Sequence, residues 1–167
     1  GGSPTFSGCD IANNFIYQSG PEPCPDCDVY DSCGTAQGMG LYIGSGYGNG
    51  CTIEGCRIIG NTVKDRYTLP CTESGFPALS TGGGIYQTGN GSLSITDTII
   101  EGNWAASVGG IYAFNSMLDM KRCLIADNPG GVSVGSGPSE QATIECTFDE
   151  CIFADNQGIA VSPGTTY

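Results

Sequence analysis

The chain has 167 residues, of which 28 are glycine and none is histidine, and its formal net charge is −12. This length suits a single domain with a core. The acidic balance argues against nucleic acid or uronate polymers as partners, and the missing histidine excludes His-dependent catalytic triads. The sequence has no run of about 18 apolar residues, so we expect no membrane insertion.

Short segments in which apolar residues alternate with polar ones recur along the chain, and each ends in an asparagine. Residues 1–17 contain the first copy and residues 38–61 the second. The two clearest copies lie within residues 82–128, with Asn103 and Asn128 25 residues apart, and a further copy ends at Asn156. Alternation with period 2 predicts strands, and a fixed period of this length in a glycine-rich chain predicts a solenoid.

Aligning the copies gives columns of similar inward-facing residues. The first column holds Cys51, Leu93, Leu118 and Cys146, and the second holds Phe6, Ile53, Ile95, Met120 and Phe148. The third holds Cys9, Cys56, Thr98, Cys123 and Cys151, and the fourth holds Ile11, Ile58, Ile100, Ile125 and Phe153. Another strand, always preceded by glycine, supplies Leu41, Ile85, Ile111, Val132 and Ile159. Such columns are what a stack of parallel coils needs, because each coil buries its side chains only against its neighbours.

The asparagine column is predicted to form a ladder of turns; its members are Asn14, Asn61, Asn103, Asn128 and Asn156. Asparagine tolerates the left-handed backbone conformation, and stacked amides can bond to one another. We therefore interpret these residues as structural rather than as ligand contacts.

Two insertions separate the early copies, at residues 18–37 and 62–81, and insertions of this kind often form the binding face of a solenoid. The first contains Cys24, Cys27 and Cys33, and the second contains Cys71. A Cys-x-x-Cys spacing occurs in zinc and redox sites, but no second pair at metal spacing is present, so disulfide-tied loops are the favoured interpretation. The acidic residues of the first insertion could instead collect Ca²⁺; they are Glu22, Asp26, Asp28 and Asp31.

Ten cysteines in so short a chain favour an oxidising, extracellular compartment. Cys9 with Cys56, and Cys123 with Cys151, occupy one column in successive coils, and neighbouring strands are close enough for a disulfide. Stacked side chains point in parallel, however, so these residues could equally pack as buried thiols. Asn90 begins an Asn-Gly-Ser sequon between two strands and is a glycosylation candidate.

The paired motifs Gly-Gly-Ile-Tyr at 109–112 and Phe-Ala-Asp-Asn at 153–156 resemble repeats of polymorphic outer-membrane proteins and autotransporter passengers. More broadly, the chain resembles the right-handed parallel β-helix proteins of the pectin-lyase-like fold. The resemblance implies an all-β, right-handed parallel β-helix of about five coils, one domain over residues 1–167. Many such proteins bind or cut polysaccharides, which makes a carbohydrate-binding or carbohydrate-cleaving protein, or an adhesin fragment, the alternative function.

The charged residues do not select a catalytic site. Lys121 aligns with Asp149 one coil on, Arg122 with Glu150, and Asp97 with Arg122; such pairs mainly fix register. Asp127 and Asp155 share a column, and paired carboxylates can hydrolyse glycosides, but nothing further marks them. We therefore expect no enzyme, and no cofactor apart from the Ca²⁺ candidate.

The chain begins with half a coil and stops with the complementary half, residues 158–167. If a second copy followed Tyr167, the spacing from Ile159 to its Phe6 would fall within the range of the internal spacings. No amphipathic helix hides the strand edge at either end, and bare strand edges pair with other chains. The sequence therefore predicts a secreted structural glycoprotein that assembles with itself, head to tail, into a fibre or surface layer. The alternative explanation of the half coils is that the chain is a piece of a longer repeat protein.

Overall fold

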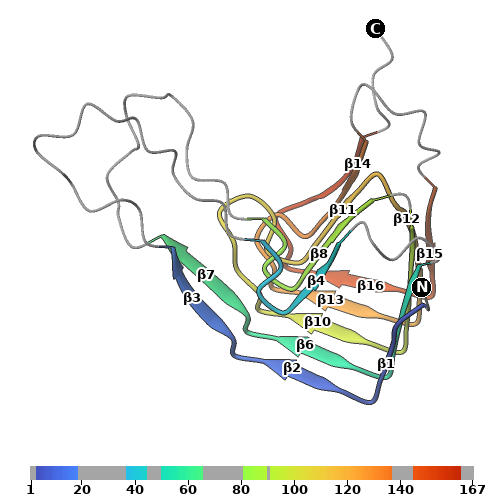
Figure 1. Ribbon diagram of the computed structural model, residues 1–167, viewed down its shortest axis with the longest axis horizontal. Helices are drawn as coiled ribbons and strands as arrows, with labels where there is room; N and C mark the ends of the chain where they lie inside the picture. The colour runs from blue at the N-terminus through green and yellow to red at the C-terminus, as the bar shows by residue number, and fades with distance from the viewer. Residues whose placement is uncertain are drawn as a thin grey trace, which may run out of the picture.

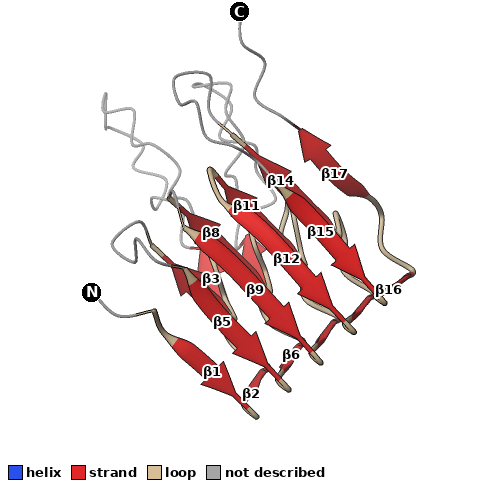
Figure 2. Ribbon diagram, turned by 90° about the vertical axis from the view of Figure 1, so that its right-hand side faces the viewer, coloured by secondary structure: helices blue, strands red, loops and turns tan. Residues whose placement is uncertain are grey.

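The computed structural model describes residues 3–18, 37–44, 50–65, 81–89, 91–136 and 145–162. These residues wind into five coils of parallel strands, as the sequence predicts (Figure 1). Each coil contributes one strand to each of three five-stranded sheets. The coil is therefore the repeating unit, and the sheets run along the stack (Figure 2).

The first sheet has the order β1-β5-β9-β12-β15. Its strands are β1 (Thr5–Ser7), β5 (Cys51–Glu54), β9 (Ser92–Thr96), β12 (Met117–Lys121) and β15 (Cys146–Asp149). The second sheet contains β2 (Asp10–Ala12), β6 (Arg57–Ile59), β10 (Ile99–Glu101), β13 (Leu124–Ala126) and β16 (Ile152–Ala154). The third contains β4 (Leu41–Ile43), β8 (Ile85–Thr88), β11 (Ile111–Phe114), β14 (Val132–Gly135) and β17 (Ile159–Ser162). Coil 1 thus begins at β1 and coil 5 at β15.

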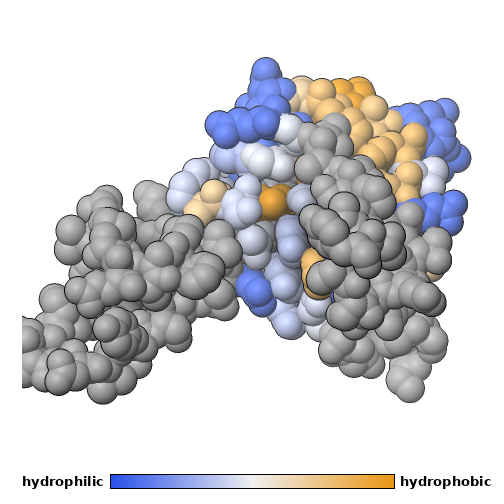
Figure 3. Space-filling view, turned by 90° about the horizontal axis from the view of Figure 1, so that it is seen from above, coloured by the Kyte–Doolittle hydropathy of each residue, from blue (hydrophilic) through white to orange (hydrophobic). Residues whose placement is uncertain are grey.

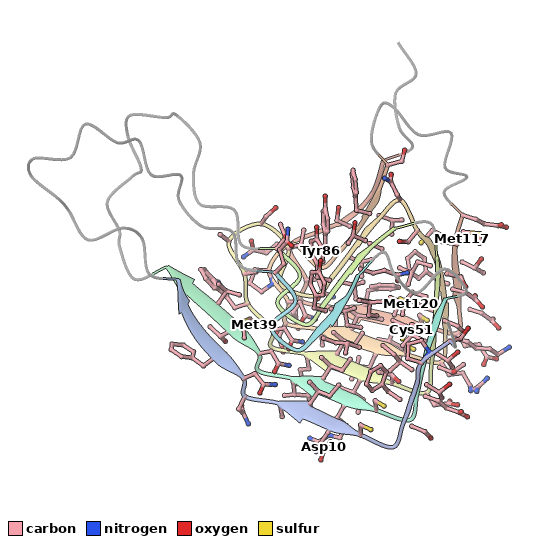
Figure 4. All side chains as sticks on the ribbon, viewed as in Figure 1. Asp10, Met39, Cys51, Tyr86, Met117 and Met120 are labelled. Atoms are coloured by element: carbon pink, nitrogen blue, oxygen red, sulfur yellow. The ribbon has the colours of Figure 1, made fainter. Side chains whose placement is uncertain are left out.

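The strand register confirms the predicted columns. In the first sheet Ile53 pairs with Phe6 on one side and with Ile95 on the other. In the second sheet Ile100 pairs with both Ile58 and Ile125. These side chains fill the triangular space between the three sheets, where Figure 4 places Met120 and Cys51. The core is therefore a set of aliphatic columns, and the residues of each interior coil are covered by the coils before and after it.

The left-handed turn residues differ from the prediction, which assigned this conformation to the asparagine column. Positive φ occurs one position earlier, at Asn13, Gly60, Gly102, Asp127 and Asp155. A second left-handed column joins the first sheet to the second, at Gly8, Gly55, Asp97, Arg122 and Glu150. The asparagines are free to turn their amides inward because the preceding residue makes the corner.

The glycine before each strand of the third sheet is explained by close approach between coils. At Gly84, an added Cβ would lie 2.8 Å from the carbonyl oxygen of Gly110 and 3.1 Å from Nδ2 of Asn103. A side chain at this position would therefore push apart both the backbone and the asparagine ladder.

A short fourth sheet was not predicted. Strand β3 (Phe15–Gln18) pairs in register with β7 (Thr62–Asp65) and extends away from the three main sheets (Figure 1). The sequence places residues 62–65 within the second insertion, whereas the structure makes them a strand. Long insertions after β3 and β7 hid this pairing, because nothing in their spacing shows that the two segments stack.

Candidate functional site

The two end coils differ from the interior coils in how well their core side chains are covered. Among the described residues, the contiguous hydrophobic cluster of the core contains seventeen buried side chains, and all of them except Ile43 of β4 lie in coils 2 to 4. Eight further apolar residues pack against this core while staying partly exposed, and every one belongs to coil 1 or coil 5. They are Phe6, Cys9, Ile11, Leu41, Cys146, Phe148, Cys151 and Phe153. Figure 3, in which coil 5 lies toward the top, shows an apolar area there with hydrophilic residues on both sides.

The asparagine ladder is present and has a direction. Asn61 donates from its backbone N–H and from Nδ2 to Oδ1 of Asn103, at 3.0 and 2.9 Å. Its Nδ2 also donates to the carbonyl oxygen of Ile11 in the coil before, at 2.9 Å. Asn103 and Asn128 repeat this pattern toward the next coil, and all three amides are fully buried. Each Oδ1 therefore accepts from the coil before and each backbone N–H donates to the coil after, while Nδ2 donates to both.

The same polarity leaves opposite groups free at the two ends of the ladder. Asn14 donates from its backbone N–H and Nδ2 to Asn61, but no described residue donates to its Oδ1. Asn156 accepts from Asn128 and donates from Nδ2 to the Ile125 carbonyl, but it has no acceptor in a following coil among the described residues. Coil 1 thus presents an acceptor where coil 5 presents donors.

The described cysteines are thiols, which corrects one of the two predicted alternatives. Cys9, Cys56, Cys123 and Cys151 stack as expected but are all free, so the pairs Cys9–Cys56 and Cys123–Cys151 are not disulfides. Their Sγ atoms contact backbone carbonyl oxygens, and that of Cys56 lies 3.5 Å from the Phe6 oxygen. The Cys9 N–H in turn donates to Sγ of Cys56 at 3.4 Å. The thiol therefore serves as a link in the stack, and Thr98 takes the same role with its hydroxyl.

Burial makes three of the thiols poor nucleophiles. It raises the pKa of Cys51, and it raises the pKa of Cys123 and of Cys146 to about 11. A thiolate is the reactive form, so these residues are packing groups.

Two of the three predicted charge pairs are present. Arg122 makes a two-pronged ion pair with Asp97, at 2.7 and 2.6 Å, and Lys121 lies 2.6 Å from Asp149. The structure records no ion pair between Arg122 and Glu150, because the guanidinium is turned to the preceding coil. An unpredicted pair joins Arg57 to Asp10 at 3.7 Å. All of these side chains are exposed, so they tune register more than stability.

A stack of tyrosines on the outside of the third sheet is the feature that sequence reasoning missed. The rings of Tyr42 and Tyr86 lie 5.4 Å apart and almost parallel, and those of Tyr86 and Tyr112 lie 5.3 Å apart. Figure 4 places Tyr86 on the outer side of the coil. Gln37 donates to the Tyr86 hydroxyl at 3.1 Å, and burial raises the pKa of Tyr86 and Tyr112. The signal was in the sequence, because Leu-Tyr at 41–42 and Ile-Tyr at 85–86 and 111–112 put one tyrosine at the same place in three successive coils.

One core position is polar. Gln87 lies in the inward column of the third sheet, paired with Ile43 and Ala113, and it is fully surrounded. Its Oε1 is the one buried side-chain oxygen or nitrogen atom without a hydrogen-bond partner in the part of the chain that the structure describes. Coils 1, 3 and 4 have apolar residues at this position, namely Ile43, Ala113 and Val134. These residues offer no polar group with which Gln87 could form a binding site.

Several predicted site residues lie outside the described residues. They are the glycosylation candidate Asn90, the acidic Ca²⁺ candidates Glu22, Asp26, Asp28 and Asp31, and the loop cysteines Cys24, Cys27, Cys33 and Cys71. Within the described ranges, no group of three or more acidic, cysteine or histidine side chains could hold a metal ion. Asp127 and Asp155 are exposed turn residues with positive φ, so the corner explains their shared column.

None of the described segments is an apolar helix of the length that crosses a bilayer. A family model described as a right-handed beta helix region matches residues 1–167. Comparisons with curated proteins and with solved structures found no match.

Proposed function

Since the chain belongs to the right-handed β-helix family, whose fold serves many functions, we propose that it is an extracellular structural protein. Its β-helix is the building block of a fibre or surface layer, and copies add head to tail through their end coils. The chain then has no catalytic role, and its main partner is a second copy of itself.

The observation that carries this proposal is the partial cover of the end-coil core. Phe6 and Phe148 occupy the same column as Ile53, Ile95 and Met120, which are fully buried. Full burial of a side chain of this size contributes about 1.5–3 kcal/mol relative to exposure. Stacking coil 5 of one copy on coil 1 of another would cover Phe148 of the first copy and Phe6 of the second, because the column would continue across the junction.

The interface between copies would be heterologous, since coil 5 of one copy meets coil 1 of another. Such an interface leaves a free coil 1 and a free coil 5 on every oligomer, so it grows without a limit set by symmetry. Growth of this kind produces a filament.

Electron microscopy and light scattering of the purified chain test the proposal. We expect filaments whose length rises with protein concentration, and more of them at higher salt, because salt screens the repulsion between copies of net charge −12. Phe148→Asp should abolish them, whereas Thr147→Asp, which adds the same charge to an outward-facing residue of β15, should preserve them. A monodisperse monomer at all concentrations would overturn the proposal.

A second candidate function, carbohydrate binding, is favoured by the tyrosine stack. Tyr42 is 53% exposed and has Tyr86 against one face of its ring. A rigid aromatic face of this kind can pack against the apolar face of a neutral sugar.

A glycan array and a reducing-sugar assay separate the two functions. If carbohydrate binding is the function, the wild-type chain binds neutral glycans and Tyr42→Ala does not, while Phe15→Ala, an exposed aromatic outside the stack, changes nothing. Release of reducing ends would add cleavage to binding.

The extracellular location rests on the cysteines and the sequon of the sequence. Because the six described cysteines are thiols, the case for an oxidising compartment depends on Cys24, Cys27, Cys33 and Cys71. Counting free thiols by mass spectrometry, with and without a reductant, tests it: an oxidised location predicts four that become free only after reduction.

A further inference from the structure

The hydrogen-bond ladders inside the chain fix the geometry of a junction between two copies. We infer that copies join in one direction and one register, with coil 5 of one copy stacked on coil 1 of the next, so that Asn156 donates to Asn14 and Cys151 lies beside Cys9. This inference rests on the proposed head-to-tail assembly and specifies its interface.

The asparagine column supplies the first argument. Between coils 2 and 3, a backbone N–H and an Nδ2 donate to one Oδ1, and the Nδ2 of the following coil returns a bond to the carbonyl two residues before the turn. The same pattern across the junction gives two bonds from Asn156 to Oδ1 of Asn14, and one from Nδ2 of Asn14 to the carbonyl of Phe153. The free acceptor of coil 1 and the free donors of coil 5 would therefore satisfy each other.

The cysteine column repeats the argument with the same polarity. Inside the chain, the N–H of Cys9 donates to Sγ of Cys56, and that Sγ contacts the carbonyl of Phe6 in the coil before. Across the junction, the N–H of Cys151 would face Sγ of Cys9, and that Sγ would face the carbonyl of Phe148. Two independent columns thus prefer one direction of stacking.

The opposite arrangement, with two like ends meeting, breaks both columns. A two-fold axis between two coils 1 or two coils 5 turns one copy over, so the strands would meet antiparallel and the asparagines would not align. The free acceptor of Asn14, or the free donors of Asn156, would then be buried without a partner. Burying a polar group without a partner is unfavourable, so the ladders disfavour this arrangement.

The surface charges are compatible with the inferred register. Asp149 would stand beside Ser7, Glu150 beside Gly8, and Asp155 beside Asn13. In these columns each carboxylate of coil 5 therefore meets an uncharged residue of coil 1, and no like charges are opposed.

Cross-linking of the cysteines tests the direction and the register together. Inside one copy, Cys9 and Cys151 are four coils apart, roughly 19 Å at the spacing of neighbouring strands, which is too far for a disulfide. A Cys9–Cys151 disulfide therefore forms only between copies. The assembled chain is oxidised with diamide, which takes up the two protons and two electrons that each pair of thiols loses, and the linked peptides are identified by mass spectrometry.

Two substitutions remove competing links inside the chain. Cys56→Thr and Cys123→Thr place threonine where the chain itself has Thr98, whose hydroxyl holds the same position in the column. The wild-type chain is oxidised in parallel, so that a folding defect in the double variant is recognised.

We expect Cys9–Cys151 to be the dominant link between copies and to vanish in Cys151→Ser. Cys146 lies on the same edge of coil 5 but would face Pro4 of the next copy, so we expect no link to it. Filaments that yield mainly Cys9–Cys9, Cys151–Cys151 or Cys9–Cys146 links, or no link between Cys9 and Cys151, would overturn the inference while leaving head-to-tail or other assembly standing. A chain that stays monomeric would overturn the proposed function as well.

Discussion

Coils 3 and 5 are built from similar residues in the same register, but only coil 3 has a neighbour on both sides. Ile95 and Ile100 of coil 3 are fully buried, whereas Phe148 and Phe153 of coil 5 remain partly exposed even though their rings pack edge to face at 5.1 Å. The difference comes from position in the stack and not from the side chains, because phenylalanine buries more surface than isoleucine when it is covered. In this fold, burial is supplied by the neighbouring coil.

The largest expected difference is in the free energy of unfolding when side chains of one core column are shortened in coil 3 and in coil 5. Ile100→Ala should lower the free energy of unfolding by about 2–5 kcal/mol, because it opens a cavity between two covering coils. Phe153→Ala should cost the monomer less, since part of that ring already contacts solvent. Urea unfolding of both variants checks this order, and equal losses would mean that coil 5 is covered by something else.

The asparagine ladder gives a second contrast. Asn103→Ala removes the acceptor for two donors of Asn61 and the donor to Ile58, all of them buried. At about 1–3 kcal/mol for each group left unsatisfied, this substitution should destabilise the chain more than Asn156→Ala does at the open end. Thermal unfolding measures the stability of both variants. A larger loss of stability for Asn156→Ala in the monomer would contradict the expected order.

Thiol chemistry distinguishes coil 4, another interior coil, from coil 5 without changing the stability of either. The pKa of Cys123, raised by burial to about 11, leaves roughly one thiol in a thousand ionised at pH 8. Cys123 should therefore react with a maleimide only when its coil opens, while Cys151, partly exposed in the end coil, reacts without unfolding. Mass spectrometry of samples taken at intervals measures the rate of maleimide modification at each cysteine. Similar rates for Cys123 and Cys151 would contradict the difference in burial between their coils.

The smallest expected effect concerns the surface pair of Asp97 and Arg122. The hydrogen bond from Arg122 lowers the pKa of Asp97, so the pair stabilises the folded chain above the usual aspartate pKa of about 3.9. That contribution is lost as the pH falls through the lower folded value. Asp97→Asn should therefore weaken the chain slightly at neutral pH and not at all at the acid end. A penalty that grows toward acid pH would contradict the assignment.

The sequence predicts the parts of this fold that repeat. The repeat of the sequence assigns each residue a position within its coil. From this follow the columns through Ile53 and Asn61, the number of coils, and the pairing of Lys121 with Asp149. Three features needed coordinates. The strand pair β3–β7 lies beside insertions that obscure the register, the left-handed corner falls one residue before each asparagine, and the sequence left open whether Cys9 and Cys56 are thiols or a disulfide.

The candidate interface was partly predictable for the same reason. That Phe6 and Phe148 share a column follows from the alternation. The direction of the asparagine ladder does not follow from the alternation. The turns that carry Asn14 and Asn156 decide which amide atom faces which coil. The tyrosine stack could have been found by aligning the residues that follow Ile85 and Ile111, but alternation by itself marks outward residues only as polar or variable.

The most direct test of the account is sedimentation velocity of the 167-residue chain over a wide range of concentrations, beside Phe148→Asp. Head-to-tail stacking predicts a sedimentation coefficient that keeps increasing with concentration for the wild type and stays at the monomer value for the variant. A wild-type chain that sediments as one monomeric species throughout, or that stops at a closed dimer, would contradict it.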